Sequence, residues 1–165
     1  MRFSETADKL KIKELHYAFA STVYGETLTA CSQYGLCFAG FVTSSRTDAV
    51  ADLQRRFPRA ALQESADAAV NIFGSVEALH LVGTDFQRRV WLALMTVGYG
   101  QTISYSQLAA RAGMPRAIRA TASAVAANPL SIVIPCHRII RSDGSIGQYY
   151  WGSELKKRIL EAEQR

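Results

Sequence analysis

The stretch "SYSQLAARAGMPRAIRATASAVAAN", residues 104–128, has the pattern of two helices joined by a short turn. Its first four residues form a capping box, in which Ser104 can accept a hydrogen bond from a backbone N–H while Gln107 reaches back. The residues AGMP then favour a turn, and Pro115 suits the first position of the second helix. A helix, a turn with glycine and a second helix outline a helix-turn-helix, so we expect this motif in the second half of the chain.

The second of these helices has almost no side-chain bulk on one surface. The small residues there are Ala117, Ala120, Ser123 and Ala124. Such a surface permits close approach to another backbone, including that of a duplex, with Arg116 and Arg119 as the groups that reach out. Small residues also serve tight helix packing in proteins that never meet nucleic acid. The residues alone leave both interpretations open.

A further helix is expected just upstream. The residues TDFQ at 84–87 form a second capping box. An apolar stripe follows, made of Phe86, Val90, Leu94 and Val97. This spacing predicts a helix over residues 84–97 that buries one face, and the residues GYG at 98–100 end it.

The first half of the chain is β-rich. The stretch "LTACSQYGLCFAGF", residues 28–41, favours two short strands joined around residues 33–35. Residues 47–57 have apolar positions at helical spacing, and Pro58 ends that helix. Residues 60–80 are alanine-rich and predict partly helical structure. We therefore expect an α/β (α+β) protein with an N-terminal sheet-plus-helix domain at 1–80 and a mainly helical domain at 81–165.

Length and charge set broad limits on the function. The chain has 165 residues, enough for one ordinary domain or two small ones. No stretch approaches the roughly 20 apolar residues of a membrane span, and residues 1–13 lack the apolar core of a secretion signal. We therefore expect a cytoplasmic protein with no membrane partner. The net charge of +5 suits either a polyanionic partner such as nucleic acid or a merely basic protein.

Basic side chains gather in the last third of the chain. They include Arg111, Arg116, Arg119, Arg138, Arg141, Lys156, Lys157 and Arg158. Their position beside the expected helix-turn-helix matters more for a polyanionic partner than the net charge does.

The three cysteines have no zinc-finger spacing. Cys31 and Cys37 lie among apolar residues, where a buried thiol is inert, and we interpret them as structural. Cys136 is followed by His137 and Arg138 within "IVIPCHRII", residues 132–140. This stretch is either a strand end with three accidental polar side chains or a reactive centre on a rigid mount.

A cysteine reacts as its thiolate and needs a base, a cation or a helix N-terminus nearby. His137 is the obvious base, but consecutive residues of an extended chain point to opposite sides, so a water could bridge the two side chains. Such an imidazole also needs a group that sets its tautomer. The candidates are Glu154, Glu161 and Glu163, and the residues alone do not choose among them.

Five motifs resemble those of the O6-alkylguanine-DNA alkyltransferases, in the same order and at matching spacing. They are "GTDFQRRVWLAL", "ISYSQLA", "RAIRATASAVAANP", "IPCHRII" and "GQYYWG". The resemblance runs from about residue 80 to the end and covers the first half only in outline, and it is nearest to the methyltransferase half of the bacterial adaptive-response proteins. It implies a ribonuclease H-like first domain and a winged-helix, helix-turn-helix second domain. The zinc-bound, phosphotriester-repairing domain of those proteins has no counterpart in the sequence.

The resemblance also implies chemical roles. Cys136 corresponds to the thiol that takes the alkyl group from guanine O6, and His137 to the base that deprotonates it through a water. Glu163 falls where the family has the carboxylate that orients this histidine. Asn128 corresponds to the asparagine that braces the active-site turn, and Tyr105 to the tyrosine that donates a hydrogen bond to the departing guanine.

Contacts to DNA and to the flipped base are implied as well. Arg119 corresponds to the arginine that enters the duplex and fills the vacated stack. The expected DNA-binding residues are Arg119, Tyr105, Arg116, Ala120 and Ser123. The expected pocket wall is the loop 146–151, with Ile146, Gly147, Tyr149 and Trp151.

The implied function is DNA repair by a single-turnover suicide reaction that moves a methyl group from O6-methylguanine in duplex DNA to Cys136. The implied partner is double-stranded DNA with alkylated guanine, and we expect a monomer, no cofactor and no metal. His16, Cys31, Cys37 and His80 do not reproduce the structural zinc site of some family members. A non-catalytic lesion sensor or helix-turn-helix transcription regulator is the alternative, and a thiol hydrolase would need an oxyanion site that is not recognisable.

The chain departs from the family at three positions. Gly98 stands where a proline is usual, and Gln101 stands where glutamate is frequent, which puts the rigidity of that turn in doubt. Tyr150 occupies a pocket position that holds a smaller residue in some relatives. The sequence leaves open the tolerance for alkyl groups larger than methyl and the activity on O4-methylthymine.

Overall fold

The computed structural model describes residues 1–165 and divides into two compact units. The first unit is residues 1–84 with 129–133, and the second is residues 85–128 with 134–165. The expected domain limits, 1–80 and 81–165, differ from these units at the boundary and in the segment 129–133, and they stay a prediction.

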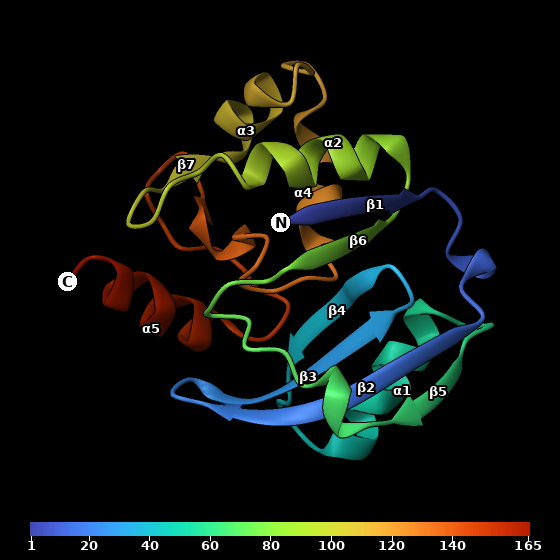
Figure 1. Ribbon diagram of the computed structural model, residues 1–165. Helices are drawn as coiled ribbons and strands as arrows, with labels where there is room; N and C mark the ends of the chain where they lie inside the picture. The colour runs from blue at the N-terminus through green and yellow to red at the C-terminus, as the bar shows by residue number, and fades with distance from the viewer. The chain divides into compact units, whose positions relative to one another are not determined.

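The first unit is built on a six-stranded mixed sheet (Figure 1). Its strands are β1 (Arg2–Thr6), β2 (Glu14–Thr22), β3 (Gly25–Ser32), β4 (Gly35–Phe41), β5 (Ala61–Glu64) and β6 (Ala78–Val82). They lie in the order β1-β6-β4-β3-β2-β5. The central strands β4, β3 and β2 are antiparallel neighbours, whereas β1–β6, β6–β4 and β2–β5 are parallel pairs.

The turn between β3 and β4 confirms the strand pair predicted around residues 33–35. Gly35 has a φ of +132°, and a Cβ at that position would lie 2.6 Å from the Ala78 carbonyl oxygen. Only glycine fits this combination of backbone angle and close approach. The start of β4 therefore requires glycine at this position.

Helix α1 (Arg46–Arg56) confirms the predicted helix before Pro58. Ser45 caps it by accepting a hydrogen bond from the Asp48 backbone N–H. Leu53 and Phe57 enter the main apolar cluster of the sheet, which also contains Leu15, Leu28 and Phe38. Burying a side chain such as Leu53 contributes about 2 kcal/mol, so this face holds the helix on the sheet.

The prediction of partly helical structure in residues 60–80 is wrong for all but three residues. The segment forms β5, one 3-10 turn, η2 (Ala66–Ala68), and the start of β6. Leu79 and Leu81 are fully buried in β6, which pairs with β1 and β4. Pairing in the sheet therefore outweighs the helix propensity of the alanines. One more 3-10 turn, η1 (Lys9–Lys11), precedes β2.

The segment 129–133 joins the first unit through the backbone of β4. The Ala39 N–H donates to the Pro129 carbonyl at 2.8 Å, and the Ser131 N–H donates to the Ala39 carbonyl at 2.9 Å. Ile132 then has a φ of +69°, which is rare for a β-branched residue. The backbone is thus held in a strained turn immediately before Cys136 and its neighbours.

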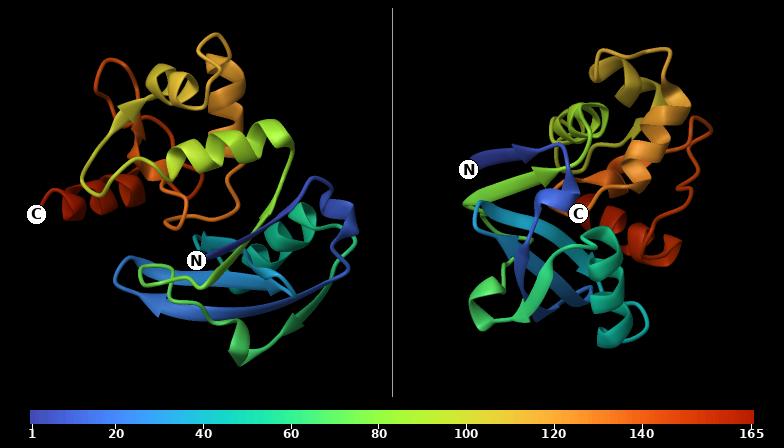
Figure 2. Two further views of the ribbon diagram at one scale, coloured as in Figure 1. Left: turned by 45° about the horizontal axis from the view of Figure 1, so that its top comes forward. Right: turned by 90° about the vertical axis from the view of Figure 1, so that its right-hand side faces the viewer.

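The second unit is mainly helical (Figure 2). Its elements are α2 (Asp85–Leu94), β7 (Ile103–Ser104), α3 (Tyr105–Arg111), α4 (Ile118–Ala126), η3 (Cys136–Arg138), β8 (Ile139–Ile140) and α5 (Ser153–Glu163). The capping box of Ser104 and Gln107 is present as predicted. The Trp91 indole N–H donates to the Ala124 carbonyl at 2.8 Å and ties α2 to α4.

Two predicted helix ends differ in the structure. Helix α2 ends at Leu94, because the next residues tighten into i→i−3 bonds, including Val97 N–H to the Leu94 carbonyl at 3.0 Å. Helix α4 begins at Ile118, because Pro115 and Arg116 form a turn that the Ala117 N–H closes on the Met114 carbonyl at 2.9 Å. The existence and order of α2, α3 and α4 are as predicted.

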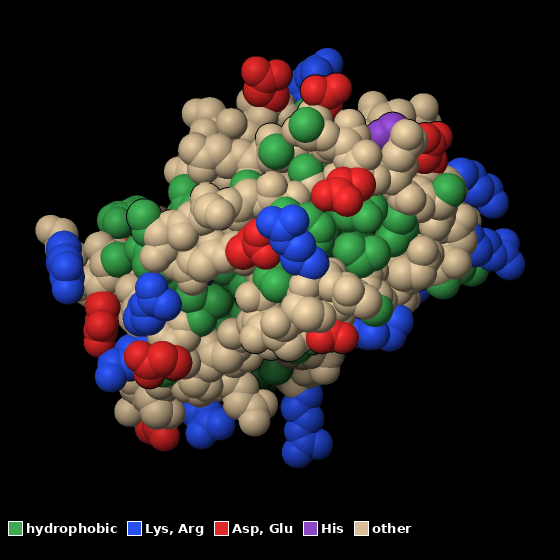
Figure 3. All heavy atoms as spheres, turned by 90° about the horizontal axis from the view of Figure 1, so that it is seen from below, with side chains coloured by type: hydrophobic (Ala, Val, Ile, Leu, Met, Phe, Trp, Pro, Cys, Tyr) green, Lys and Arg blue, Asp and Glu red, His purple; other side chains and the backbone are tan.

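The predicted fold class is confirmed: a sheet-plus-helix unit is followed by a mainly helical one. No helix has the length and apolar character needed to span a bilayer. On the face that Figure 3 shows, Lys and Arg side chains lie interspersed with Asp and Glu. Positive charge is therefore not gathered into one patch on that face.

Candidate active site and nucleic-acid interface

Cys136, His137 and Arg138 form a single 3-10 turn, η3, rather than the end of a strand. The Cys136 N–H donates to the Ile134 carbonyl at 2.7 Å. The same carbonyl accepts a hydrogen bond from the Asn128 side-chain amide at 2.9 Å, and Asn128 is buried. These two hydrogen bonds to one carbonyl fix the backbone that carries the thiol.

Cys136 lies at a cavity of about 540 Å³ within the second unit. The residue is only 5% exposed. Burial raises the pKa of the Cys136 thiol, while the Asn128 side chain, the charge of Lys156 and the Tyr149 side chain each lower it. The thiol therefore needs a base to react at neutral pH.

Aromatic side chains form much of the cavity wall. Tyr105, Tyr149, Tyr150 and Trp151 all line it. The ring of Trp151 meets those of Tyr149 and Tyr150 edge-on, with centroids 5.4 and 5.1 Å away. The cavity wall thus offers aromatic surface that an aromatic ligand can contact.

Two residues expected in the wall, Ile146 and Gly147, do not line the cavity. Gly147 has a φ of +72°, and a Cβ there would lie 3.4 Å from the Arg141 side chain. These two positions shape the loop that carries Tyr149.

The His137 imidazole is buried and is oriented by Glu163. Its Nε2 lies 2.9 Å from Glu163 Oε1, while its Nδ1 is buried and has no hydrogen-bond partner. A carboxylate can only accept, so Nε2 carries the proton and Nδ1 presents its lone pair. Burial lowers the pKa of His137, although the hydrogen bond to Glu163 opposes this. The neutral imidazole is therefore available as a base. Of the three candidate carboxylates, the structure brings Glu163 to the histidine.

Glu163 is also bound by Arg138. The Arg138 Nε donates to Oε2 at 2.9 Å and its Nη2 donates to Oε1 at 2.8 Å. Burial by itself would raise the pKa of Glu163, but the hydrogen bonds from His137 and Arg138 outweigh it and lower the pKa to about 2. The carboxylate stays ionised throughout the physiological range.

Lys156 was expected only as one of several basic residues, yet it is buried beside the thiol. Its side chain is 1% exposed, and its ammonium donates to the Ile139 carbonyl. Burial lowers the pKa of Lys156 to about 8, although the Cys136 charge opposes this. A signal existed in the sequence: Lys156 shares the i, i+3, i+4 face of α5 with Ile159 and Leu160, which are both buried.

The small residues of α4 divide between an exposed face and a buried one. Arg119, Ala120 and Ser123 are exposed, and Arg116 is exposed in the preceding turn. Ala124, which was expected on this open surface, is instead buried where α4 meets α2. The exposed face is lean enough for close approach to a duplex.

The turn with the two departures from the family pattern is closed by Gln101. The Gly98 N–H donates to the Gln101 side-chain oxygen at 3.2 Å, and the Gln101 N–H donates to the Gly98 carbonyl at 3.1 Å. Glutamine thus ties the turn through its own side chain.

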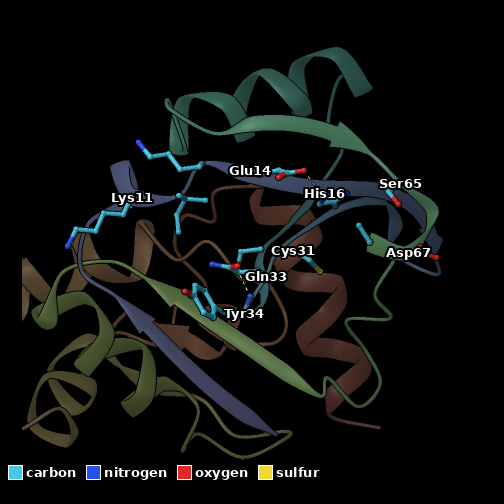
Figure 4. A pocket seen from close by; sticks show the side chains of 12 residues that line it. Lys11, Glu14, His16, Cys31, Gln33, Tyr34, Ser65 and Asp67 are labelled. Atoms are coloured by element: carbon cyan, nitrogen blue, oxygen red, sulfur yellow. Dashed lines mark hydrogen bonds and ion pairs between the residues drawn. The ribbon is translucent and has the colours of Figure 1, made fainter.

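A second cavity, of about 520 Å³, lies in the first unit (Figure 4). Its thiol, Cys31, has a pKa raised by burial. The His16 imidazole also borders this cavity, and its Nε2 lies 3.0 Å from Glu14 Oε1. Burial is the one cause of the pKa shift of Cys31, whereas at Cys136 the charge of Lys156 acts against burial.

No group of three or more His, Cys, Asp or Glu side chains is arranged to hold a metal ion. His80 is fully buried, and its ring nitrogens lie 2.6 Å from the Thr6 hydroxyl and 2.7 Å from the Ser32 hydroxyl. Two hydroxyl groups thus occupy both of its hydrogen-bonding positions.

The second unit defines a class: helix-turn-helix proteins with a buried thiol at a cavity, followed in the chain by a buried imidazole that is bound to a carboxylate. A protein family described as "6-O-methylguanine DNA methyltransferase, DNA binding domain" matches residues 85–165. The inducible methylated-DNA–protein-cysteine methyltransferase of Bacillus subtilis is 34% identical over 94% of this chain and 88% of its own length. The corresponding protein of Methanosarcina barkeri is 35% identical over 91% of this chain and 98% of its own length. The chain belongs to the methylated-DNA–protein-cysteine methyltransferase family.

Longer relatives and a solved structure extend the comparison. The regulatory protein Ada of Salmonella typhimurium is 39% identical over 98% of this chain, which spans 48% of that relative. The chain thus covers about half the length of this relative and of Escherichia coli Ada. The crystal structure of Mycobacterium tuberculosis OGT in complex with DNA has a TM-score of 0.71 and 30% identity, covering 90% of this chain and 92% of that one.

Proposed function

We propose that this protein is a DNA repair enzyme, a methylated-DNA–[protein]-cysteine S-methyltransferase that moves the methyl group of O6-methylguanine in duplex DNA to its own Cys136. The observation that carries the proposal is the buried thiol at an aromatic-walled cavity, with the His137–Glu163 pair in the same unit. The names of the relatives and the DNA complex of the Mycobacterium tuberculosis neighbour support it.

The reaction begins with removal of the thiol proton. The free Nδ1 of His137 accepts it through a bridging water, since this nitrogen has no partner in the protein. Glu163 holds the Nε2 proton in place and stabilises the imidazolium that forms. Lys156 lowers the pKa of Cys136 through its charge, after burial has raised it, and so stabilises the thiolate.

The thiolate then displaces guanine from the methyl carbon. A sulfur–carbon bond forms as the carbon–O6 bond breaks, and the bond's electron pair leaves with the guanine. Burial raises the pKa of Tyr105, which therefore remains a hydroxyl donor for the charge that develops on the base. The proton held by His137 returns to the departing guanine. The product is a thioether that no residue of the chain can cleave, so each molecule acts once.

Access to O6 requires the damaged nucleotide to leave the stack, at a cost of a few kcal/mol. The exposed face of α4, with Ala120 and Ser123, can approach the minor groove closely. Arg119 is exposed on the same face and fills the vacated position, while Arg116 binds the backbone. Tyr105 begins α3 at the cavity, where it receives the flipped base. The proposed DNA-repair role favours a cytoplasmic, nucleoid-associated location.

The test is incubation with a duplex oligonucleotide that contains O6-methylguanine, followed by intact mass spectrometry. We expect the mass to rise by one methyl group, with a limit of one per chain. Cys136→Ala should abolish the gain, and the matched variant Cys31→Ala should keep it. Duplex binding without any gain in mass would refute methyl transfer and favour the alternative, a lesion sensor or transcription regulator. Repeated cleavage of a thiol-reactive ester would instead indicate a hydrolase.

A further inference from the structure

Besides the hydrogen bond with His137, Glu163 accepts three more, two from Arg138 and one from Gly100. Arg138 binds both carboxylate oxygens, and the Gly100 N–H donates to Oε2 at 3.3 Å. The guanidinium, in turn, donates through Nη1 to the Val97 carbonyl at 2.7 Å. We call Val97, Tyr99, Gly100, Arg138 and Gln164 the carboxylate clasp.

The carboxylate clasp also holds the end of α5. The Gln164 side-chain amide donates to the Gly100 carbonyl at 2.8 Å, and the Tyr99 hydroxyl donates to the Ala162 carbonyl at 3.4 Å. The Arg138 guanidinium lies 5.7 Å from the centre of the Tyr99 ring, within reach of a cation–π contact. A Cβ at Gly100 would lie 2.9 Å from the Glu163 carbonyl oxygen. The fit between turn and helix end is therefore close.

These contacts limit what Glu163 can do chemically. Its two oxygens together accept four hydrogen bonds, one from His137, two from Arg138 and one from Gly100. A carboxylate so fully bound is a very weak base. It can orient the Nε2 proton of His137 but not remove it. His137 therefore keeps its Nε2 proton and can gain a proton only at Nδ1.

We propose that Arg138, held by the rest of the carboxylate clasp, is a positioning residue that confines Glu163 to orienting His137 and keeps His137 neutral and ready to accept a proton at Nδ1. The inference deepens the proposed function and rests on the assignment of His137 as the base for Cys136. Arg138 touches neither the thiol nor the cavity wall, and it acts through Glu163.

The charged groups that face His137 come from two elements. Glu163 and Lys156 lie on α5, and Arg138 and Cys136 flank the imidazole in η3. Glu163 favours the protonated imidazole, whereas Arg138 and Lys156 disfavour it. When the Arg138 charge is removed, less positive charge opposes the stabilisation of the protonated imidazole by Glu163. The pKa of His137 then rises, and a smaller fraction is neutral at a given pH.

The experiment combines two measurements on the full chain with Arg138→Gln. Nitrogen-15 NMR of the His137 ring reports its tautomer and titration midpoint, and the pH profile of Cys136 methylation reports its use as a base. We expect the midpoint and the acid limb of the profile both to move upward, and methylation below neutral pH to slow about 10-fold. Lys157→Gln removes one positive charge from an exposed position of α5 and should change neither.

A merely structural role would slow methylation in Arg138→Gln and leave the His137 midpoint in place, which would overturn the proposal. Arg138→Lys keeps the charge and loses the two-pronged contact, so the midpoint should stay near that of the wild type while methylation slows. If Arg138→Gln does not fold by circular dichroism, Arg138→Lys decides: a His137 midpoint near that of the wild type with slower methylation supports the proposal, and a midpoint that moves upward or an unchanged methylation rate contradicts it. These NMR results do not depend on DNA, so failure of methyl transfer in the wild type would refute the proposed function separately.

Discussion

Glu163→Gln tests how much stability the ionised carboxylate supplies. Glutamine keeps an oxygen that can accept a hydrogen bond from the His137 Nε2–H. It cannot ionise, and its single oxygen cannot accept both hydrogen bonds from Arg138 in the way that the two carboxylate oxygens do. Burial raises and hydrogen bonds from His137 and Arg138 lower the pKa of Glu163, from 4.5 to about 2 in the folded protein. One pKa unit corresponds to about 1.4 kcal/mol, so the carboxylate contributes about 3 kcal/mol to folding at neutral pH.

The sign follows from the direction of the shift. Because the pKa of Glu163 is lower in the folded state, its contribution is fully present above pH 4.5 and is lost as the pH falls toward 2. Between pH 6 and pH 3 the wild type should therefore lose about 2 kcal/mol from this group. The Glu163→Gln variant should be about 3 kcal/mol less stable at pH 6, because Arg138 is left without its partner, and should approach the wild type at low pH.

Urea unfolding at pH 6 and pH 3, followed by tryptophan fluorescence, measures both differences. Glu161→Gln is the matched control, since Glu161 is exposed on the same helix and lies 4.0 Å from Lys157. Such surface pairs contribute about 0–1 kcal/mol, so the control should follow the wild type. A Glu163→Gln variant that loses as much stability as the wild type between the two pH values would refute the reasoning.

Three further variants probe the thiol, the duplex contact and the cavity. Lys156→Met should slow iodoacetamide labelling of Cys136 at pH 7 by about 10-fold, since the charge that lowers the thiol pKa is gone; an unchanged labelling rate contradicts this. Arg119→Ala should reduce methylation by duplex DNA at least about 10-fold in a mass assay and spare methylation by a single strand, where no stack is vacated; equal losses on both would argue against intercalation. Tyr150→Ser should raise the benzyl-to-methyl transfer ratio about 10-fold by widening the cavity, and an unaltered ratio would exclude Tyr150 as a size limit.

Short-range features were predictable because they depend on neighbouring residues. The Ser104–Gln107 capping box arises from contacts within four residues, and the turn before Gly35 depends on the local backbone angles; both are present as predicted. Helix ends were less accurate, as Pro115 shows, because the competition between a turn and a first helical turn is decided by small energies.

The alanine-rich segment 60–80 was mispredicted for a different reason. Its residues prefer helix in isolation, but pairing of β6 with β1 and β4 satisfies their backbone groups in a sheet. The strand partners lie far away in sequence, so no local pattern reports them.

The amino-acid sequence by itself determined the helix-turn-helix, the position of the thiol and, through its motifs, the family. The choice of Glu163 over Glu154 and Glu161 rested on resemblance, and its carboxylate meets His137 only because α5 packs beside η3. The burial of Lys156 and the contacts of Arg138 with the carboxylate clasp were decided by tertiary structure alone. The physical reason is that pKa values and hydrogen-bond partners depend on distance and desolvation, which are set when remote segments pack together.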